Sequence, residues 1–319
     1  MTTRPDVSVV MSVHNDANYL TDCIESVLSQ TGVSFEFIAV DDGSTDRSGS
    51  ILDAYASKDK RLRVIHQTNQ GLTRALITGC SIANGEYLAR QDSDDISFQG
   101  RLAKLAGHLA SHDAAVLVAS GAVMMGPNGE LLVDGLPSPA VSGDLTFCHG
   151  SLMFRKSAYD SVGGYRRQFA AAQDVDLQLR LAELGKLDLV RDVLYAYRIR
   201  EGSISSRSPV QKQLSRLAEA ARDARRNGRD ERPVLEEASR LGSAARQQPR
   251  SEPGTGNYFI GRCLYSRRDR RAMTYLWAAC QTNPLSMRNW LALAEASMLT
   301  RSSVARDVTL RGIIPRQSA

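Results

Sequence analysis

Residues 86–95 read Glu-Tyr-Leu-Ala-Arg-Gln-Asp-Ser-Asp-Asp, a short apolar run that leads directly into three carboxylates. The run from Glu86 to Ala89 predicts a β-strand. Carboxylates this close repel one another, so a positive partner is expected among them. A divalent cation suits this place, because Mg²⁺ and Mn²⁺ prefer oxygen ligands and commonly share their coordination shell with substrate phosphates. The alternative is an acidic turn exposed to solvent.

The first hundred residues alternate strand patterns with helix patterns. Strands are expected at 7–13, 35–40, 62–65 and 86–89, and each of the first three is followed by apolar residues at helical spacing. Strands separated by helices of 10–15 residues imply βαβ units. The sequence therefore predicts an α/β fold in which helices cover both faces of a largely parallel sheet.

Two further polar clusters follow predicted strands. His14-Asn15-Asp16 comes after the strand at 7–13, and Asp41-Asp42 comes after the strand at 35–40. Asn15 or Asp16 is also expected to cap the next helix. In parallel sheets ligands bind at the carboxyl ends of the strands, so both clusters should meet the acids at 92–95 on one edge of the sheet. A solvated acidic turn does not require this convergence.

The rest of the chain continues with mixed patterns and then becomes helical. A hairpin is expected from Val116–Met125 and Leu131–Val133, extended segments at 147–154 and 194–199, and a helix at 174–184. From about Pro209 the pattern is helical and rich in Ala, Arg and Leu. Residues 247–257 read as a linker, and 258–280 with 286–299 as a helical hairpin.

The charge divides the chain into two regions. Residues 1–206 hold 19 Lys and Arg against 25 Asp and Glu, whereas residues 207–319 hold 21 against 10. We therefore expect two domains, 1–206 and a basic, all-helical 207–319. The five cysteines are scattered, no run has the ~20 apolar residues of a membrane span, and no apolar signal region begins the chain. These features predict a cytoplasmic protein.

Six short motifs resemble those of a known family in order and spacing. They are 9–15, 40–46, 69–73, 83–95, 163–165 and 173–177. Over about residues 6–206 the chain resembles the family 2 glycosyltransferases, which have the nucleotide-sugar-binding, Rossmann-like GT-A fold. The resemblance implies a mixed, mainly parallel sheet flanked by helices. It also implies transfer of a sugar, with inversion, from a UDP-, GDP- or dTDP-sugar to a saccharide or lipid-linked acceptor.

The resemblance also implies roles for individual residues. Asp92 and Asp94 would hold Mn²⁺ or Mg²⁺ together with the diphosphate, and Asp41 or Asp42 would contact the nucleoside. Asp174 would be the general base that accepts the proton of the acceptor hydroxyl. The full set of implied nucleotide-sugar-binding residues is Ser12, Asn15, Asp41, Asp42, Arg74, Asp92, Ser93, Asp94, Arg198 and Arg200.

Two departures from the family pattern leave an alternative open. Gln173 stands where a glutamate often precedes the base, and Arg200 stands where a histidine is common. They are compatible with a non-catalytic nucleotide-sugar-binding or scaffold protein on a degenerate transferase fold. For Asp174 the alternative role is a helix N-cap, and for Arg198 and Arg200 a solvated surface pair.

The basic region 207–319 has two interpretations. It could attach the protein peripherally to an anionic membrane surface, or it could be a solvated helical face packed on the catalytic domain. A nucleic-acid partner is not expected, because the region lacks interleaved aromatic residues and recognised nucleic-acid-binding motifs.

Overall fold

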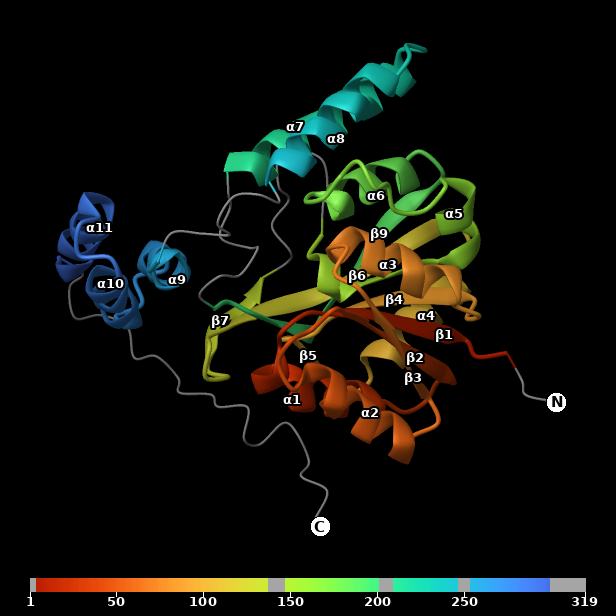
Figure 1. The fold of residues 1–319 in the computed structure, drawn as a ribbon, viewed down its shortest axis with the longest axis horizontal. Coiled ribbons are helices and arrows are strands. Elements are labelled where there is room, and N and C mark those ends of the chain that lie inside the picture. The colour runs from red at the N-terminus through yellow and green to blue at the C-terminus, as the bar shows by residue number, and fades with distance from the viewer. Residues whose placement is uncertain (1–3, 137–146, 201–208, 246–252, 299–319) are drawn as a thin grey trace. The chain divides into compact units, whose positions relative to one another are not determined.

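The computed structural model describes residues 4–136, 147–200, 209–245 and 253–298 of the 319-residue chain (Figure 1). Two compact units form. The first comprises Met1–Ala122, Gly135–Tyr197 and Val210–Ala245, and the second comprises Val123–Asp134, Arg198–Pro209 and Arg246–Ala319. The division into domains at residues 206 and 207 stays a prediction.

The strands form one mixed sheet, as predicted. Four of them are parallel and lie in the order β3 (Leu62–Gln67), β2 (Phe35–Asp42), β1 (Val7–Val13) and β4 (Tyr87–Asp92). The sheet continues through β8 (Leu152–Arg155), which is antiparallel to both β4 and β6 (Ala115–Met125). Beyond β6 lie β9 (Lys186–Arg198) and the short β5 (Ile96–Ser97), while β7 (Leu131–Leu136) pairs with β6 in the expected hairpin.

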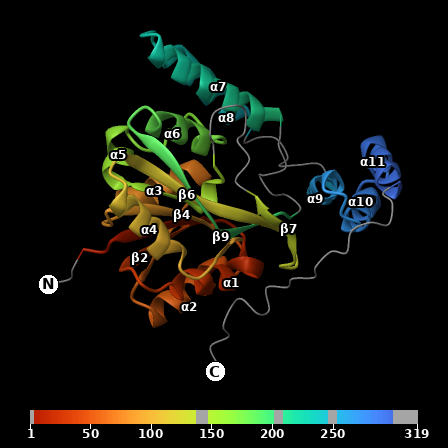
Figure 2. The ribbon, with the colours of Figure 1, turned by 180° about the vertical axis from the view of Figure 1, so that it is seen from behind.

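Helices cover both faces of the sheet (Figures 1 and 2). Val9 and Met11 of β1 pack toward α1 (Ala17–Leu28), α2 (Ser48–Lys58) and α4 (Arg101–Ser111). Val10 faces the opposite side, toward α3 (Leu72–Ser81), α5 (Lys156–Ser161) and α6 (Gln173–Leu181). Successive side chains of a strand point to opposite faces. The continuous apolar run at 7–13 therefore reflects a strand buried on both sides.

Two long helices follow in the first unit. They are α7 (Pro209–Arg226) and α8 (Arg232–Ala245), which confirm the helical pattern predicted after Pro209. Leu214 of α7 and Ala238 of α8 are fully buried against Phe169, in the segment that leads into α6. This packing supports the position of α6 beside the sheet.

The second unit contains three helices in the described part of the chain: α9 (Thr255–Ser266), α10 (Arg271–Thr282) and α11 (Met287–Ser297). The single helix expected over 258–280 was wrong, because the chain turns at Arg267–Arg270. Arg268 has φ +58°, and the Asp269 carboxylate accepts a bond of 2.9 Å from the backbone N–H of Arg271 at the start of α10. Of the predicted linker 247–257, residues 247–252 lie outside the described residues, and 255–257 are helical.

Three strand predictions also need correction. β4 runs to Asp92 and thus includes the first acid of the cluster, rather than ending at Ala89. A 3-10 turn, His149–Ser151, interrupts the extended segment expected at 147–154. β9 begins at Lys186, well before residue 194, because Leu187 and Leu189 pack against one face of the sheet. Among the described helices, none combines the length and apolar character needed to cross a bilayer.

Candidate active site

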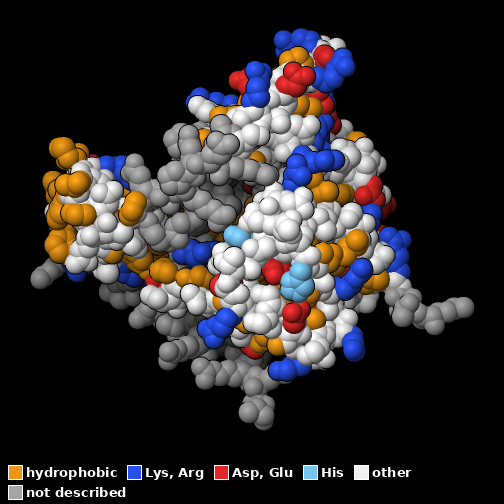
Figure 3. Space-filling model, in the orientation of Figure 1, with side chains coloured by type: hydrophobic (Ala, Val, Ile, Leu, Met, Phe, Trp, Pro, Cys, Tyr) orange, Lys and Arg blue, Asp and Glu red, His pale blue; other side chains and the backbone are white. Residues whose placement is uncertain are grey.

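Three polar clusters meet at the carboxyl ends of β1, β2 and β4. In the sheet register Ser12 lies beside Asp92, and Val13 lies beside Asp41. The order of the strands reverses between β1 and β4, and α/β sheets bind ligands at such a switch point. Figure 3 shows acidic and histidine side chains gathered on the face of the first unit turned toward the viewer. The structure thus brings the predicted clusters to one edge.

The acidic cluster forms a tight turn in which its side chains alternate between outside and inside. The backbone N–H of Asp95 bonds to the Asp92 carbonyl at 3.2 Å, so the chain is not extended through Asp94 as expected. Asp92 and Asp94 are nevertheless both partly exposed, whereas Ser93 and Asp95 are buried. The two outward acids therefore remain on one side and can address a common ligand.

The inward side chains of this turn are held by partners that the sequence reasoning missed. The Ser93 hydroxyl donates to the Asp16 carboxylate at 2.5 Å, and the Tyr195 hydroxyl donates to Asp95 at 2.7 Å. Asp16 occupies the N-cap position of α1, as expected, but its side chain makes no capping bond and instead anchors the acidic turn. Instead, the Asp46 carboxylate accepts the bond from the first N–H of α1, that of Ala17, at 3.1 Å.

A buried arginine supplies positive charge beside the acids. Arg90 is 2% exposed, and its guanidinium lies 2.5 Å from Asp92 and donates to the Val10 carbonyl at 3.2 Å. Residues i and i+2 of a strand share a face, so the Arg-Gln-Asp spacing was the signal that could have revealed this pair. The positive partner expected among the acids is therefore supplied in part by the chain itself.

A second buried arginine holds the strand beneath the site. The Arg101 guanidinium donates to the carbonyls of Arg90 and Gly150, both at 2.7 Å, and to the Ser97 hydroxyl at 2.7 Å. Its guanidinium also stacks over the Tyr195 ring at 4.9 Å. Nothing local in the sequence marks this role, because every partner except Ser97 is distant along the chain.

The donor set of Asp92 and Asp94 fits a hard divalent cation. Burial raises the pKa of Asp92; Arg90 opposes this shift, and the charge of Asp94 adds to it. Arg90 supplies one positive charge against the two carboxylates of Asp92 and Asp94, so the three side chains together carry a net negative charge. Paired carboxylate oxygens suit Mg²⁺ or Mn²⁺, which keep several positions for water and phosphate oxygens. In the described residues no three or more His, Cys, Asp or Glu side chains gather into a metal-binding group.

Asp42 is used to build the loop that precedes α3. Its carboxylate accepts bonds from the Gln67 side chain at 2.7 Å, the backbone N–H of Gln70 at 2.8 Å and that of Gly71 at 2.7 Å. Gly71 has φ +87°, which favours glycine, and the helix begins directly after it. Asp42 thus connects the end of β2 to the start of α3.

Asp41 and Asn15 organise the neighbouring loop. The Asp41 carboxylate accepts the N–H of Ser44 at 3.0 Å and lies 2.9 Å from the His66 ring. The Asn15 side-chain oxygen accepts the N–H of Thr45 at 2.8 Å, and Asn15 itself is left-handed with φ +57°, which asparagine tolerates. Both residues therefore shape the 43–46 loop at the edge of the site.

Asp174 lies in the first turn of α6, where it is not the N-cap; that position belongs to Ala172. Burial raises the pKa of the Asp174 carboxyl, backbone N–H groups oppose this shift, and the negative charge of Asp92 adds to it. Because the charge of Asp92 contributes to the raised pKa of Asp174, Asp174 lies within electrostatic range of the acidic turn. A carboxylate with a raised pKa is a better proton acceptor than an ordinary one.

The three predicted arginines occupy different places. Arg74 is an exposed residue of α3 whose guanidinium donates to the Gln70 side chain at 3.4 Å. Arg198 and Arg200 belong to the second unit. Arg198 is buried there and donates to the carbonyls of Gly126 and Pro127 at 3.1 and 3.0 Å. The interpretation of Arg198 as a solvated surface residue is therefore wrong.

Comparison with known proteins identifies the family. The profile described as "Glycosyl transferase family 2" matches residues 8–133. EpsE of Bacillus subtilis (strain 168), whose name also places it among the glycosyltransferases, is 38% identical over 193 residues, which are 58% of this chain and 69% of EpsE. The chain belongs to glycosyltransferase family 2. The resemblance inferred from the six motifs is thus confirmed, and with it an enzyme family.

Other relatives share shorter parts of their own length. Glycosyltransferase GlyG of Streptococcus pneumoniae serotype 4 is 43% identical over 113 residues, 35% of this chain and 38% of GlyG. Chondroitin synthase of Pasteurella multocida is 28% identical over 195 residues, 60% of this chain and 20% of the synthase. The family 2 glycosyltransferase described here thus spans only a fraction of these two relatives.

Solved structures agree with the fold. TarS of S. aureus (residues 1–349) with UDP-GlcNAc has a TM-score of 0.57 at 19% identity and covers 91% of this chain and 88% of TarS. Mannosyltransferase PcManGT of Pyrobaculum calidifontis with GDP-Man and Mn²⁺ has a TM-score of 0.53 at 17% identity, covering 93% and 86%. At these identities the likeness establishes the fold alone, and it confirms the predicted GT-A architecture.

Proposed function

We propose that this family 2 glycosyltransferase moves a sugar, with inversion, from a nucleotide-diphosphate donor to an acceptor hydroxyl. One observation carries the proposal: Asp92 and Asp94 are partly exposed at the switch point of the sheet, and Asp174 lies within electrostatic reach of Asp92. This arrangement offers a place for a leaving diphosphate beside a base for an entering hydroxyl. A bacterial surface polysaccharide or glycolipid is the proposed product, supported by the name of the chondroitin synthase relative.

In the proposed site Asp92 and Asp94 would hold Mn²⁺ or Mg²⁺. The chemistry supplied by such a cation would be neutralisation of the negative charge that develops on the leaving diphosphate. Arg90 keeps its pairing with Asp92 and so orients that carboxylate from below the site. Ser93 fixes the turn between the two acids through its bond to Asp16. The solved neighbour that contains GDP-Man and Mn²⁺ supports this choice of ion.

Asp174 acts as the general base. Its carboxylate accepts the proton of the acceptor hydroxyl while that oxygen forms a bond to the anomeric carbon. The bond from this carbon to the diphosphate oxygen breaks at the same time, and the electron pair leaves with the nucleoside diphosphate. Attack from the side opposite to the leaving group inverts the anomeric centre. The proposed roles of Asp92 and Asp174 are therefore separate.

Nucleotide recognition is assigned to the remaining predicted residues. Asp41 accepts fewer bonds within the protein than Asp42, so it keeps more capacity to accept N–H or ribose O–H donors. We therefore assign the nucleoside contact to Asp41. Ser12, Asn15 and Arg74 remain proposed contributors to binding of a UDP-, GDP- or dTDP-sugar. The roles implied by the resemblance for Arg198 and Arg200, which belong to the second unit, stay predictions.

A thermal-shift screen of UDP-, GDP- and dTDP-sugars, with and without Mn²⁺, tests the proposal. A ligand at about 100 times its Kd stabilises the folded protein by about 2.7 kcal/mol, so a bound donor raises the unfolding temperature. Donors that shift the wild type then go into an assay for release of nucleoside diphosphate. If no nucleotide sugar stabilises the full chain at millimolar concentration, the proposed donor class is wrong.

The same assay separates the enzyme from the non-catalytic alternative. A degenerate scaffold protein would bind a nucleotide sugar and release no nucleoside diphosphate, with or without acceptors. Retention of Asp92, Asp94 and Asp174 in one region favours catalysis. Binding without any turnover across saccharide and lipid-linked acceptors would favour the scaffold.

The second unit provides a surface for the proposed membrane contact. Hydrophobic side chains gather on the surface of the second unit over α10 and α11 (Figure 3), and the Trp277 and Trp290 rings meet edge to face at 6.0 Å. The exposed large apolar residues of this unit are Met273, Trp277, Leu285, Met287, Trp290, Leu291 and Met298. Exposed arginines, among them Arg267, Arg270 and Arg288, accompany them. Aromatic side chains with arginines suit the interface of an anionic bilayer.

Vesicle flotation tests this contact. The full chain should float with vesicles of phosphatidylcholine and phosphatidylglycerol, but less with phosphatidylcholine alone. The double variant Trp277→Ser/Trp290→Ser should lose most of this binding. Leu184→Ser is a matched control, because Leu184 is 51% exposed but lies in the first unit. Equal flotation of all three proteins, or none by the wild type, would rule out the membrane contact.

A further inference from the structure

The helix that carries Asp174, α6, depends on tertiary contacts for its stability. α6 has nine residues, and isolated helices shorter than about 12–15 residues are marginal in water. Ala172, directly before it, is left-handed with φ +60°, a conformation that costs a residue with a side chain about 1–3 kcal/mol. Such a conformation persists only where the surroundings fix it. The contacts of α6 therefore decide where Asp174 lies.

Buried charges fix the first turn of α6. The Asp176 carboxylate, 1% exposed, accepts bonds from the Arg180 guanidinium at 2.5 and 3.1 Å. Arg180 also donates to the Val162 carbonyl at 2.8 Å, and Arg166 lies 3.7 Å from the second oxygen of Asp176. A buried carboxylate is costly unless its charge is paired. The pairing ties α6 to the segment between α5 and α6.

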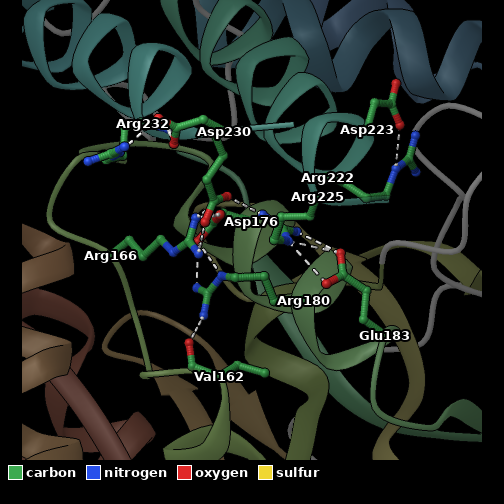
Figure 4. A network of polar contacts seen from close by, with 11 residues as sticks. Val162, Arg166, Asp176, Arg180, Glu183, Arg222, Asp223, Arg225, Asp230 and Arg232 are labelled. Carbon is green, nitrogen blue, oxygen red and sulfur yellow. Dashed lines mark hydrogen bonds and ion pairs between the residues drawn. The ribbon is translucent and has the colours of Figure 1, made fainter. Parts of the chain in front are cut away.

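The chain of charges continues into the connection between α7 and α8 (Figure 4). Arg166 donates to both carboxylate oxygens of Glu231, at 2.9 and 2.8 Å, and Arg225 donates to Glu231 at 2.5 Å. Arg225 also donates to Glu183, just beyond the end of α6, at 2.7 Å. Glu231 thus joins two arginines, one of which leads to the first turn of α6 and the other to its far end.

Apolar contacts follow the same route. Ala172 and Leu179 pack with Leu214 and Ala218 of α7 and with Ala238 of α8. Gly242 of α8 approaches the loop before α6 so closely that a Cβ there would lie 3.1 Å from the Ala170 Cβ. The strained residue that precedes α6 is therefore covered by the α7–α8 pair.

We propose that the α7–α8 hairpin is the positioning element for Asp174, with Glu231 as the residue that joins its two ionic links to α6. Glu231 does not touch the reacting atoms; it acts through Arg166, Arg225 and α6. The proposal rests on the proposed function only in that it assigns proton transfer to Asp174. It gives the helices after residue 206 a role in catalysis.

The test compares Glu231→Gln with Asp230→Asn in the full chain. Asp230 is the adjacent residue and also pairs with an arginine, Arg232, at 2.8 Å, but in the network of Figure 4 no dashed line joins it to α6. Each variant removes one carboxylate charge from the same connection. Hydrogen exchange followed by mass spectrometry measures opening of the peptides that cover residues 162–184.

We expect exchange in residues 162–184 to rise at least about fivefold in Glu231→Gln, since each lost ionic link weakens local stability by about 1 kcal/mol or more. Asp230→Asn should exchange like the wild type, and β1 and β4 should be unchanged in both variants. With a donor that the wild type turns over, Glu231→Gln should lower kcat at least about tenfold with donor KM unchanged, because donor binding does not involve Asp174.

The outcomes separate this proposal from the proposed function. Equal exchange in the two variants, or a kcat of Glu231→Gln equal to that of Asp230→Asn, would overturn the positioning role. A wild type that turns over no donor would overturn the proposed function, while the exchange experiment would still decide whether the hairpin holds α6. Where Glu231→Gln does not fold, Arg225→Lys replaces it, because lysine keeps the charge and loses the double donation to Glu183.

Discussion

Two pairs of aspartates stand at the ends of β2 and β4, the strands on either side of β1, and their surroundings differ. Asp41 and Asp42 at the end of β2 are 5% and 2% exposed, and they accept bonds from the loops around them. Asp92 and Asp94 at the end of β4 are partly exposed, with Arg90 beside Asp92. The same residue type at one edge of a sheet is therefore either buried and bonded to the loops or partly exposed. Which of the two holds depends on the N–H donors that the loops provide, and Asp41, with fewer such bonds than Asp42, keeps capacity for a ligand.

The difference has an electrostatic consequence. Backbone N–H groups of Gln70 and Gly71 donate to the Asp42 carboxylate within the folded chain. In the second pair, mutual repulsion between Asp92 and Asp94 contributes to the raised pKa of Asp92. A bound cation would relieve this repulsion, whereas the first pair needs none. The two pairs should therefore respond in opposite ways to substitution.

The largest effect is expected from a substitution of Asp174. It distinguishes proton transfer from the binding role of Asp92 and Asp94, which we call the open pair. Asp174→Asn should lower transfer by about 10²–10⁴-fold, the usual contribution of a general base. Mn²⁺-dependent donor binding, measured by thermal shift, should stay unchanged because Asp92 and Asp94 are intact. Turnover near the wild-type rate would show that another group accepts the proton.

Removing one charge of the open pair should cost activity and no stability. Asp94→Asn should lower turnover by about 10²–10³-fold, since it removes electrostatic stabilisation of the leaving group. Without added metal its free energy of unfolding in urea should equal or slightly exceed that of the wild type, because a repelling charge beside Asp92 is gone. The Mn²⁺-dependent thermal shift should disappear. A marked loss of stability would place Asp94 with the loop-building acids.

The matching change in Asp41 and Asp42, which we call the closed pair, should lower stability instead. Asp42→Asn replaces an acceptor of three bonds with a side chain that presents an NH₂ group to N–H donors. Hydrogen bonds to charged groups contribute about 1.5–3 kcal/mol each, so a loss of about 2–4 kcal/mol is expected in urea unfolding. Unchanged stability together with weaker donor binding would instead make Asp42 a ligand contact.

The smallest expected effect is a pH dependence of folding stability that comes from His66, beside Asp41. The pKa of His66 is raised by its contacts with Asp53 and Asp41. The contacts that raise the pKa of His66 stabilise the fold fully when the pH is below the unfolded-state pKa of about 6.5. This stabilisation is lost as the pH rises through the pKa of His66 in the folded state. The His66 side chain is 49% exposed, so solvent limits the contribution to about 0.5 kcal/mol.

His66→Gln tests this effect in unfolding curves at pH 6 and pH 8. The wild type should be slightly less stable at the higher pH relative to the variant, because glutamine does not titrate. An identical pH dependence in both proteins would show that His66 makes no such contribution.

Much of the fold was predictable because it rests on local patterns. The apolar run at 7–13 and the acids at the ends of β2 and β4 predicted a parallel sheet with these acids on one edge, and the register confirmed both. The predictions were wrong where distant residues decide the outcome. The side chain of Asp16 bonds to Ser93 rather than capping α1, and the helix expected over 258–280 breaks at Arg267–Arg270.

The sequence by itself determined the family, the sheet and the acids at its edge, because these depend on periodicity and motif spacing along the chain. Only the tertiary structure decided which acids are available. Asp42 accepts bonds from donors in β3 and in the loop before α3, whereas Asp92 is partly exposed beside Arg90. It likewise revealed that α7 and α8 are joined to α6 through Glu231. Asp42 and Gln67 lie 25 residues apart and Arg166 and Glu231 lie 65 residues apart, separations that no local pattern records.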